Sequence, residues 1–306
     1  MSVCLFLVTS YNQPKFCPTT SWNQTGITIA NKSPVSLETS YVYLDQNDTI
    51  YIRNENINKI QILFANSTNP FILIPGRTLY PSGLFVTRTG DIYIVPYSAN
   101  GRVQKFDWIT STYMNIAYFC DSCYDLFVTA NGILYCSMSQ SHQIATKSLN
   151  ENHNSIAIVA GVGFAGTTST SLRNPRGIFV KDNLDLYIAD CFNHRVQFFK
   201  AGQFVGITVS ETVGSMLLRY PTAVMVDGND HLYIVDTENN RIIRSELNGF
   251  RCLIGCSRSH GSASYELYHP ENMAFDTQGN IYVSDRKNYR IQKFFLVTNT
   301  CSEYIF

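Results

Sequence analysis

The feature that most constrains the fold is a short unit that occurs three times in this chain, in copies that align with one another without a gap. Its copies span residues 174–199, 220–245 and 269–294. Each copy opens with an apolar stretch after a proline, continues through a polar turn to a second apolar stretch centred on tyrosine, and ends with another turn and a third apolar stretch. Aspartate and asparagine favour turns, whereas β-branched and aromatic residues favour strands. The unit therefore predicts three short strands joined by tight turns.

Three weaker copies lie upstream, at residues 39–63, 80–106 and 123–146. One aligned position ends the second apolar stretch of every copy, and it is occupied in turn by Asn54, Pro96, Met138, Asp190, Asp236 and Asp285. These positions are 42 to 52 residues apart. A repeat of this length is typical of one four-stranded blade of a β-propeller. The six copies therefore predict six blades.

Each blade needs a fourth strand, and an apolar stretch follows each of the first five units. These stretches are residues 71–74, 114–118, 156–159, 205–209 and 250–254. Too little chain follows the sixth unit, but residues 26–30 resemble 206–209 and are expected to complete the last blade. Such closure removes the open sheet edges. The predicted fold is all-β, a six-bladed β-propeller of four-stranded blades over 17–301, with an N-terminal segment at 1–16 and a C-terminal tail at 302–306.

The repeated frame resembles a known family. It reads Pro-x-[GA]-[IV]-x-[VF], then [LI]-Tyr-[IV]-x-Asp-x-x-Asn-x-Arg-[IV], and it is clearest at 175–196, 221–242 and 270–291. This frame resembles the NHL repeat. The resemblance implies a six-bladed propeller that acts as a binding platform. Related six-bladed propellers include the amidating lyase and the calcium-dependent lactonases and paraoxonases, so the resemblance also leaves an enzyme open.

The predicted ring closure brings two cysteines together. Cys17 precedes the closing strand and Cys301 follows the last unit, so a disulfide between them would lock the ring. Short loops also suggest disulfides between Cys252 and Cys256 and between Cys120 and Cys123. The Cys120-x-x-Cys123 spacing has a zinc or redox interpretation as well, but a zinc site needs a second pair at metal spacing. Structural bridges are therefore the prediction for all six of these cysteines.

Nine cysteines and four glycosylation sequons indicate an oxidising, secretory compartment. The sequons are at Asn23, Asn31, Asn47 and Asn66. The apolar stretch at 3–8 has no preceding basic residue, and we interpret it as a strand or as the remnant of a truncated signal. No apolar stretch is long enough to span a bilayer. The 23 basic and 23 acidic residues balance, so a nucleic-acid partner is not expected, and we expect a monomer.

Three Asp/Arg pairs stand five residues apart across a turn, namely Asp190/Arg195, Asp236/Arg241 and Asp285/Arg290. A binding site needs different residues that converge, whereas a scaffold repeats the same residue, so we interpret these as structural turn ion pairs. The histidines lack metal-binding spacing, and His194 occupies a turn position that varies between copies. Glu38, Asp125 and Asn272 begin inner strands and are the candidates for side chains that face the central channel.

The prediction is a secreted, non-catalytic binding module that uses the loops on one face of the disc to bind a protein or another ligand. No catalytic residue, metal ligand or cofactor is assigned. One alternative is a metal-dependent propeller enzyme of the lactonase or amidating-lyase type, with calcium or zinc in the channel. A second alternative is an intracellular NHL adaptor. The copies agree on the scaffold, so the residues specific to this protein are expected where the copies differ.

Overall fold

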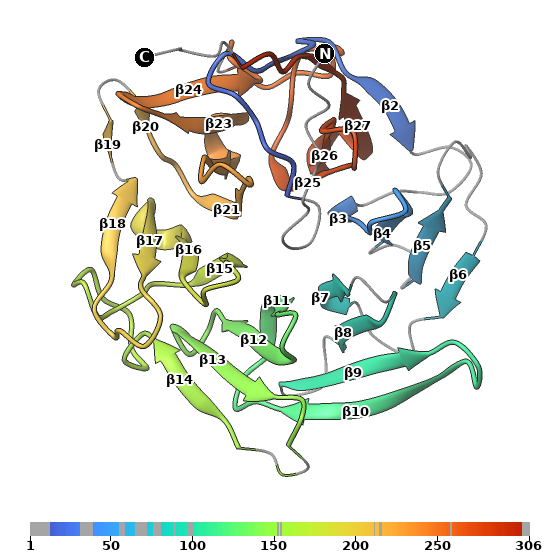
Figure 1. The fold of residues 1–306 in the computed structure, drawn as a ribbon, viewed down its shortest axis with the longest axis vertical. Helices are drawn as coiled ribbons and strands as arrows, with labels where there is room; N and C mark the ends of the chain where they lie inside the picture. Colours follow the sequence, from blue (N-terminus) through green and yellow to red (C-terminus); the bar gives the residue numbers. More distant parts are fainter. Residues whose placement is uncertain are drawn as a thin grey trace.

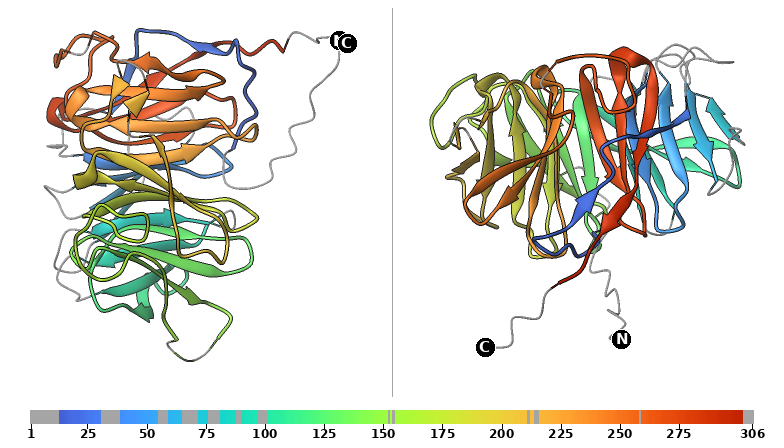
Figure 2. Two further views of the ribbon diagram at one scale, coloured as in Figure 1. Left: turned by 90° about the vertical axis from the view of Figure 1, so that its left-hand side faces the viewer. Right: turned by 90° about the horizontal axis from the view of Figure 1, so that it is seen from above.

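The structure is a computed structural model, and it describes residues 13–30, 39–54, 59–64, 72–75, 81–87, 90–96, 101–151, 153, 155–210, 212–213, 216–257 and 259–301. Within these ranges six four-stranded antiparallel sheets stand around a central axis as the blades of a propeller (Figure 1). Figure 2 shows the disc from its edge, with the blades side by side. The all-β, six-bladed prediction is confirmed.

The strands of each blade run outward from the axis in the order inner, second, third and outer. The inner strands are β3 (Thr39–Leu44), β7 (Pro81–Val86), β11 (Cys123–Val128), β15 (Pro175–Val180), β21 (Pro221–Val226) and β25 (Pro270–Phe275). The second strands are β4 (Ile50–Asn54), β8 (Ile92–Pro96), β12 (Ile133–Met138), β16 (Leu186–Asp190), β22 (Leu232–Asp236) and β26 (Ile281–Asp285). The third strands are β5 (Lys59–Leu63), β9 (Arg102–Asp107), β13 (Gln143–Ser148), β17 (Arg195–Phe199), β23 (Arg241–Glu246) and β27 (Arg290–Phe294).

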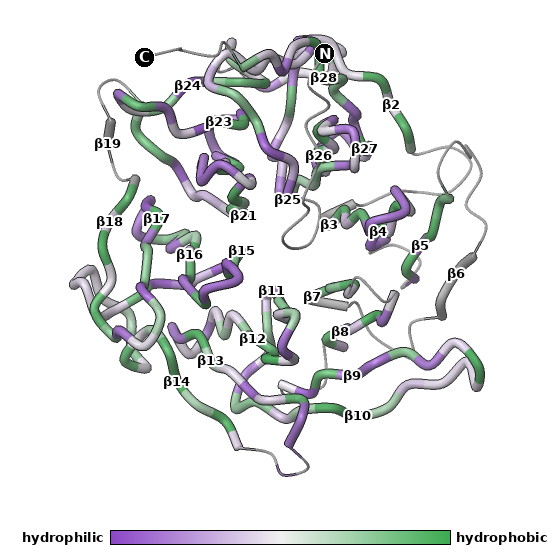
Figure 3. Tube along the Cα trace, in the orientation of Figure 1, coloured by the Kyte–Doolittle hydropathy of each residue, from purple (hydrophilic) through white to green (hydrophobic). Residues whose placement is uncertain are grey.

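The outer strands are β6 (Ile72–Pro75), β10 (Thr112–Tyr118), β14 (Ala157–Ala160), β18 (Ile207–Ser210), β24 (Gly249–Ile254) and β2 (Ile27–Ala30). Five of them follow their own blade in the chain, as expected. The sixth, β2, pairs with β27 and completes the last blade, with Ile27 opposite Lys293. The closing strand predicted at residues 26–30 is thereby confirmed. Several outer strands are apolar, as β14 and β18 show in Figure 3, and Ile207 on β18 is 62% exposed.

Short elements occupy the connections between strands. A 3-10 turn follows the second strand in blades four to six, namely η1 (Cys191–Asn193), η2 (Thr237–Asn239) and η3 (Arg286–Asn288). Two small ribbons pair β1 (Ser21–Trp22) with β28 (Leu296–Thr298) and β19 (Thr212–Val213) with β20 (Met216–Leu217). No helix in the described part of the chain is long and apolar enough to cross a membrane.

The turns between inner and second strands show why this sequence folds locally. Asp45 directly follows the first inner strand, and its Oδ1 accepts hydrogen bonds from the backbone N–H groups of Asn47 (2.8 Å) and Thr49 (3.0 Å). Asp227 and Asp276 repeat this arrangement in blades five and six. The short acidic side chain thus supplies the acceptor that a tight turn needs. We call the side of the disc that carries these turns the turn face, and the opposite side, with the 3-10 turns and the blade-connecting loops, the loop face.

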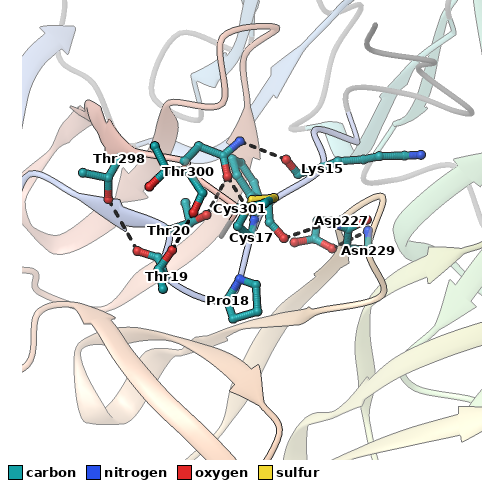
Figure 4. The surroundings of a disulfide bond; sticks show 12 residues. Lys15, Cys17, Pro18, Thr19, Thr20, Asp227, Asn229, Thr298, Thr300 and Cys301 are labelled. Carbon is teal, nitrogen blue, oxygen red and sulfur yellow. Dashed lines mark hydrogen bonds between the residues drawn. A yellow bond between two sulfur atoms is a disulfide. The ribbon is translucent and has the colours of Figure 1, made fainter. Parts of the chain in front are cut away.

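A disulfide bond on the turn face also closes the ring. Cys17 is bonded to Cys301, and their Cα atoms are 5.1 Å apart. Around this disulfide, Asn299 Oδ1 accepts hydrogen bonds from the Cys17 amide (2.9 Å) and the Thr20 hydroxyl (2.7 Å), and Asn299 Nδ2 donates to the Lys15 carbonyl (Figure 4). The two ends of the described chain are therefore joined by a covalent bond and by a polar network.

Aromatic packing holds the same segment against the last two blades. Phe16 is fully buried and contacts Trp22, Tyr233 and Phe275, with ring centroids 4.9 to 6.1 Å apart. The Trp22 indole also donates a hydrogen bond to the Gly279 carbonyl. Large buried rings contribute strongly to packing energy, so this cluster anchors the N-terminal segment independently of the disulfide.

Candidate functional site

The three Asp/Arg pairs lie inside their blades and not in the channel. In each pair the arginine Nε lies 2.7 Å from one carboxylate oxygen of the aspartate. In blade four the Arg195 guanidinium also donates to the carbonyls of Thr167, Thr168 and Ser171, in the loop that enters the blade. Burial raises the pKa of Asp190, and its hydrogen bonds and the arginine offset this in part. These pairs fasten each entry loop to its own blade and are scaffold.

The turn position after each 3-10 turn connects neighbouring blades. His194 and Asn240 adopt left-handed φ angles of 54°. His194 Nδ1 accepts a hydrogen bond from the Tyr220 amide (3.1 Å), and Asn240 Oδ1 accepts one from the His269 amide (2.9 Å). Each acceptor thus reaches the start of the next blade. This turn position varies in sequence, but where its side chain supplies an acceptor, as in His194 and Asn240, it links its blade to the next one.

The channel is built differently, because one ring of positions breaks the repeat. The third residue of each inner strand is Tyr41, Gly83, Asp125, Gly177, Ala223 or Asn272. Three of the six blades have glycine or alanine there, and at Gly177 the packing allows nothing larger. A Cβ atom added at Gly177 would lie 2.6 Å from the Cα atom of Ala223 in the next blade. Three blades nevertheless carry large polar side chains at this position.

These three polar residues meet in a cavity on the axis of the ring. Tyr41, Asp125 and Asn272 come from the first, third and sixth blades, and all three line a cavity of about 70 Å³. They are buried, with 5%, 7% and 8% of their surfaces exposed. Buried polar groups need partners to offset the loss of water. The cavity is therefore the place where polar chemistry specific to this chain is concentrated.

Asp125 is the one carboxylate among the residues that line this described cavity. Its Oδ1 accepts a hydrogen bond from the Leu126 amide (2.9 Å) and its Oδ2 accepts one from the Ile178 amide in the next blade (2.9 Å). Burial is the largest influence and raises the pKa of Asp125 from its usual value of 3.8 to about 6, although Tyr41, these amides and Arg53 all act to lower it. Its hydrogen bonds and neighbouring charge thus compensate only part of the cost of burial.

The other two members of the set have polar atoms without regular partners. Asn272 Oδ1 and the Tyr41 hydroxyl oxygen are buried and have no hydrogen bond of normal geometry. The Tyr41 hydroxyl does lie close to Asp125, since burial and the Asp125 carboxylate together raise the pKa of the phenol. The contact between the Tyr41 hydroxyl and the Asp125 carboxylate is therefore electrostatic and lacks the alignment of a regular hydrogen bond. An unpaired buried acceptor is costly, and a bound group that donates to it would remove the cost.

Charged and aromatic side chains lie next to the three polar residues on the loop-face side, and we call this region the mouth of the cavity. The Arg176 guanidinium lies 5.0 Å from the centre of the Tyr124 ring, and the Arg53 guanidinium lies 5.7 Å from the centre of the Tyr41 ring. Glu271 forms an ion pair with Arg286 at 2.8 Å. Such cation–π contacts hold each arginine against an aromatic face. The mouth thus carries both signs of charge.

An aromatic collar lies two residues further along the inner strands and lines the same cavity as the polar set. It consists of Tyr43, Phe85, Phe127 and Phe179, which follow one another around the ring and line the cavity. The centroids of successive rings are 5.3, 5.0 and 5.4 Å apart. Met225 and Ala274 continue this level of the channel in the remaining blades. The cavity therefore has a polar end and an aromatic wall.

The sequence-based candidates for the channel have different outcomes. Asp125 and Asn272 do face it, whereas Glu38 lies outside the described residues. Tyr41 was not among the candidates, although it stands at a position where the repeat frame has glycine or alanine. That mismatch with the frame was the signal that would have found it. Arg176 follows a strand-opening proline and gave no comparable signal.

One predicted disulfide is wrong. Cys123 is bonded to Cys136 on the neighbouring strand β12, with Cα atoms 5.1 Å apart, and not to Cys120. The two cysteines lie on the paired strands β11 and β12, where Cys123 is opposite Met138 and Cys136 is opposite Leu126 across a register shift. Their closeness across the strands is a relation that spacing along the chain does not reveal. Cys120 is free and exposed. The bond between Cys252 and Cys256 is present in the structure as it was expected.

The remaining cysteines and sequons complete the comparison. Cys191 is free, and burial raises the pKa of its thiol to about 12, so it is not a reactive thiolate. Cys4 lies outside the described residues, as do the sequon residues Asn31 and Asn66. Asn23 and Asn47 are exposed, so their glycosylation stays a prediction that the geometry permits.

Metal binding was tested on the donors that are present. The described residues contain no group of three or more histidine, cysteine, aspartate or glutamate side chains placed to hold a metal ion. Calcium takes six to eight oxygen ligands. In the described cavity Asp125 is the one carboxylate, and the other side-chain oxygens of the polar set are the Tyr41 hydroxyl and Asn272 Oδ1, which together fall short of six ligands. These donors do not fit a calcium or zinc centre.

Residues 267–294, which include β25 to β27, match the NHL repeat. This chain is a six-bladed β-propeller whose last blade carries an NHL repeat. A comparison of its sequence with curated proteins gives no significant match.

Solved structures with the same fold are distant in sequence. A Bacteroides thetaiotaomicron protein of unknown function has a TM-score of 0.68 at 12% identity. The match covers 94% of this chain and 75% of the Bacteroides chain. An auxiliary nutrient binding protein from Bacteroides ovatus has a TM-score of 0.66 at 14% identity, covering 94% and 76%. Virginiamycin B lyase from Staphylococcus aureus has a TM-score of 0.63 at 12% identity, covering 91% and 100%. At these identities the similarity concerns the fold of the NHL propeller alone.

Proposed function

We propose that this NHL propeller is a non-catalytic binding module that takes its ligand at the loop-face end of the channel. The observation that carries this proposal is the ring of third positions in the inner strands. The scaffold favours a small residue there, yet Tyr41, Asp125 and Asn272 converge from three separate blades. Asn272 presents a buried oxygen without a hydrogen-bond partner, and the Tyr41 hydroxyl is buried beside Asp125 without a well-aligned hydrogen bond. Proteins retain such costly groups where function requires them.

A binding role also agrees with the charges around the mouth. The Arg176 guanidinium, the Glu271–Arg286 ion pair and the Tyr124 phenol stand beside the entrance and offer contacts of several kinds. A rigid scaffold that positions variable side chains is suited to recognition. One of the proteins with a similar fold is a nutrient binding protein, which supports binding as a use of this architecture.

We place the protein outside the reducing cytosol and expect it to act as a monomer. Three disulfides join residues of the described chain, and such bonds persist in oxidising compartments. The exposed Asn23 sequon provides the test. Protein from a secretory expression host should shift in mass on glycosidase treatment and show bonded cysteines. An intracellular NHL adaptor would instead have reduced cysteines in its native host and no glycan.

The test of channel binding is a screen of small polar compounds by ligand-observed NMR on the purified protein. Compounds that bind should lose their signal changes in Asp125→Asn and Asn272→Leu variants, and should keep them in Asp182→Asn, because Asp182 is an exposed turn residue. Binding that is the same in all variants would place the ligand elsewhere. Stoichiometric calcium or zinc retained after dialysis, and lost in the channel variants, would favour the metal-dependent enzyme.

A further inference from the structure

The chemistry of the ligand can be inferred from what the cavity lacks, and this step rests on the proposed function. Asn272 Oδ1 is an acceptor without a donor. Each Asp125 oxygen accepts one backbone hydrogen bond, and an ionised carboxylate can accept about four in all. The Tyr41 oxygen can accept as well. The polar end of the cavity is therefore rich in acceptors, and a ligand that donates several hydrogen bonds would suit it.

The wall of the cavity favours a cation over a neutral donor. The aromatic collar formed by Tyr43, Phe85, Phe127 and Phe179 lines the same cavity as Asp125. Aromatic rings attract cations, and this attraction increases when the cation loses its water. A buried carboxylate beside aromatic rings thus provides two independent attractions for positive charge. A neutral alcohol or amide would gain only the hydrogen bonds.

The charges around Asp125 do not already satisfy it. Arg53 and Tyr41 both favour its ionised form, and the Arg53 guanidinium stands over the Tyr41 ring. Tyr124 and Arg176 stack on each other at the neighbouring mouth positions, and Glu271 is paired with Arg286. Burial nevertheless outweighs these influences on Asp125. An additional positive charge inside the cavity would stabilise the carboxylate further.

We propose that the loop-face end of the channel, where Asp125 and Asn272 meet the aromatic collar, binds a small protonated amine. The ammonium group would donate to the Asp125 carboxylate and to Asn272 Oδ1, with its carbon atoms against the collar. A cavity that holds one water needs about 10 to 15 Å³. The cavity of about 70 Å³ therefore accommodates an ammonium group with a few carbon atoms. The amine belongs to a free small molecule or to a lysine side chain of a partner.

The experiment is isothermal titration of the whole protein with ethylammonium chloride at pH 7.5. Ethanol and sodium acetate serve as neutral and anionic compounds of similar size. Ethylammonium should bind with one site per chain, and ethanol and acetate should bind at least tenfold more weakly. Asp125→Asn should weaken ethylammonium binding at least tenfold, Asn272→Leu should weaken it severalfold, and Asp182→Asn should leave it unchanged.

The pH profile provides a second readout. Ethylammonium stays protonated across pH 5 to 7.5, whereas Asp125 gains its proton in this range, so affinity should fall as the pH is lowered through about 6 in the native protein. In Asp125→Asn the profile should be flat. A titration of a Gly-Lys-Gly peptide and its Nζ-acetylated form distinguishes the two sources. Binding of the peptide that is tighter than that of ethylammonium, and is lost on acetylation, indicates a partner lysine.

Four results would overturn the inference. Ethanol that binds as tightly as ethylammonium would show that charge is not recognised. Affinity that is unaltered in both channel variants would place the amine elsewhere. No ethylammonium binding in a folded protein whose channel binds other compounds of the NMR screen would exclude the amine class and leave the proposed function standing. No channel binding of any compound would remove both.

Discussion

Replacing Asp125 with asparagine should make the protein more stable, relative to the native protein, as the pH rises, because this carboxyl group is held in the channel at an energetic cost. Burial raises its pKa from 3.8 to about 6 in the folded state. The folded protein thus binds this proton more tightly than the unfolded chain does. Stability is lost as the pH rises between these two values, and the full cost applies above about pH 6.

The magnitude follows from the two pKa values. Their difference is about 2.2 pH units, and each unit corresponds to about 1.36 kcal/mol. The cost of the carboxylate is therefore about 3 kcal/mol at pH 7.5 and less than about 1 kcal/mol at pH 4. Asparagine has no charge, but its single carbonyl oxygen cannot serve both the Leu126 and Ile178 amides. That loss is the same at both pH values.

The assay is urea denaturation of the native protein and of Asp125→Asn at pH 4 and pH 7.5. The difference in unfolding free energy between variant and native protein should shift in favour of the variant by about 2 kcal/mol from the lower to the higher pH. Asp182→Asn, an exposed carboxyl on the turn face, is the control and should show no such shift. A difference that is independent of pH would refute the reasoning, since it would mean that burial does not raise the pKa of Asp125.

Three further predictions concern the scaffold and the compartment. Replacing Cys17 and Cys301 with serine should lower stability by about 5 kcal/mol in urea denaturation, because this disulfide closes a loop of nearly the whole chain, and an unchanged denaturation midpoint would contradict it. Arg241→Ala should cost about 3 kcal/mol by leaving Asp236 buried without its ion pair, and the paired Asp236→Asn change should recover part of this in the same assay. Asn23→Gln should remove one glycan from protein made in a secretory host, visible as a single mass step, and no step would mean that this sequon is not used.

Much of the scaffold could be predicted because each blade repeats the same local chemistry. Apolar stretches of strand length, turns with aspartate or asparagine, and a spacing of 42 to 52 residues specify a blade six times. The closing strand could be found because residues 26–30 have the composition of an outer strand without a blade of their own, and β2 occupies this place beside β27. Local patterns carry this information, since strands and turns depend mainly on neighbouring residues.

The candidate site could be predicted only in part. Asp125 and Asn272 were recognisable as polar residues at inner-strand positions, but their meeting with Tyr41 across separate blades depends on the closed ring. The wrong pairing of Cys120 with Cys123 has the same origin, because the true partner, Cys136, is adjacent across strands and distant along the chain. Contacts between strands are set by register, which spacing in one sequence does not give.

The sequence by itself determined that this chain forms six similar blades and that Asp190, Arg195 and their equivalents belong to the scaffold, since identical residues in every clear copy serve identical local contacts. The tertiary structure decided which of the differences between copies matter. Three departures from the small-residue position lie more than one blade apart in sequence, and ring closure brings them to one axis, where burial changes their chemistry. Convergence and burial are properties of the folded ring, so they become visible only there.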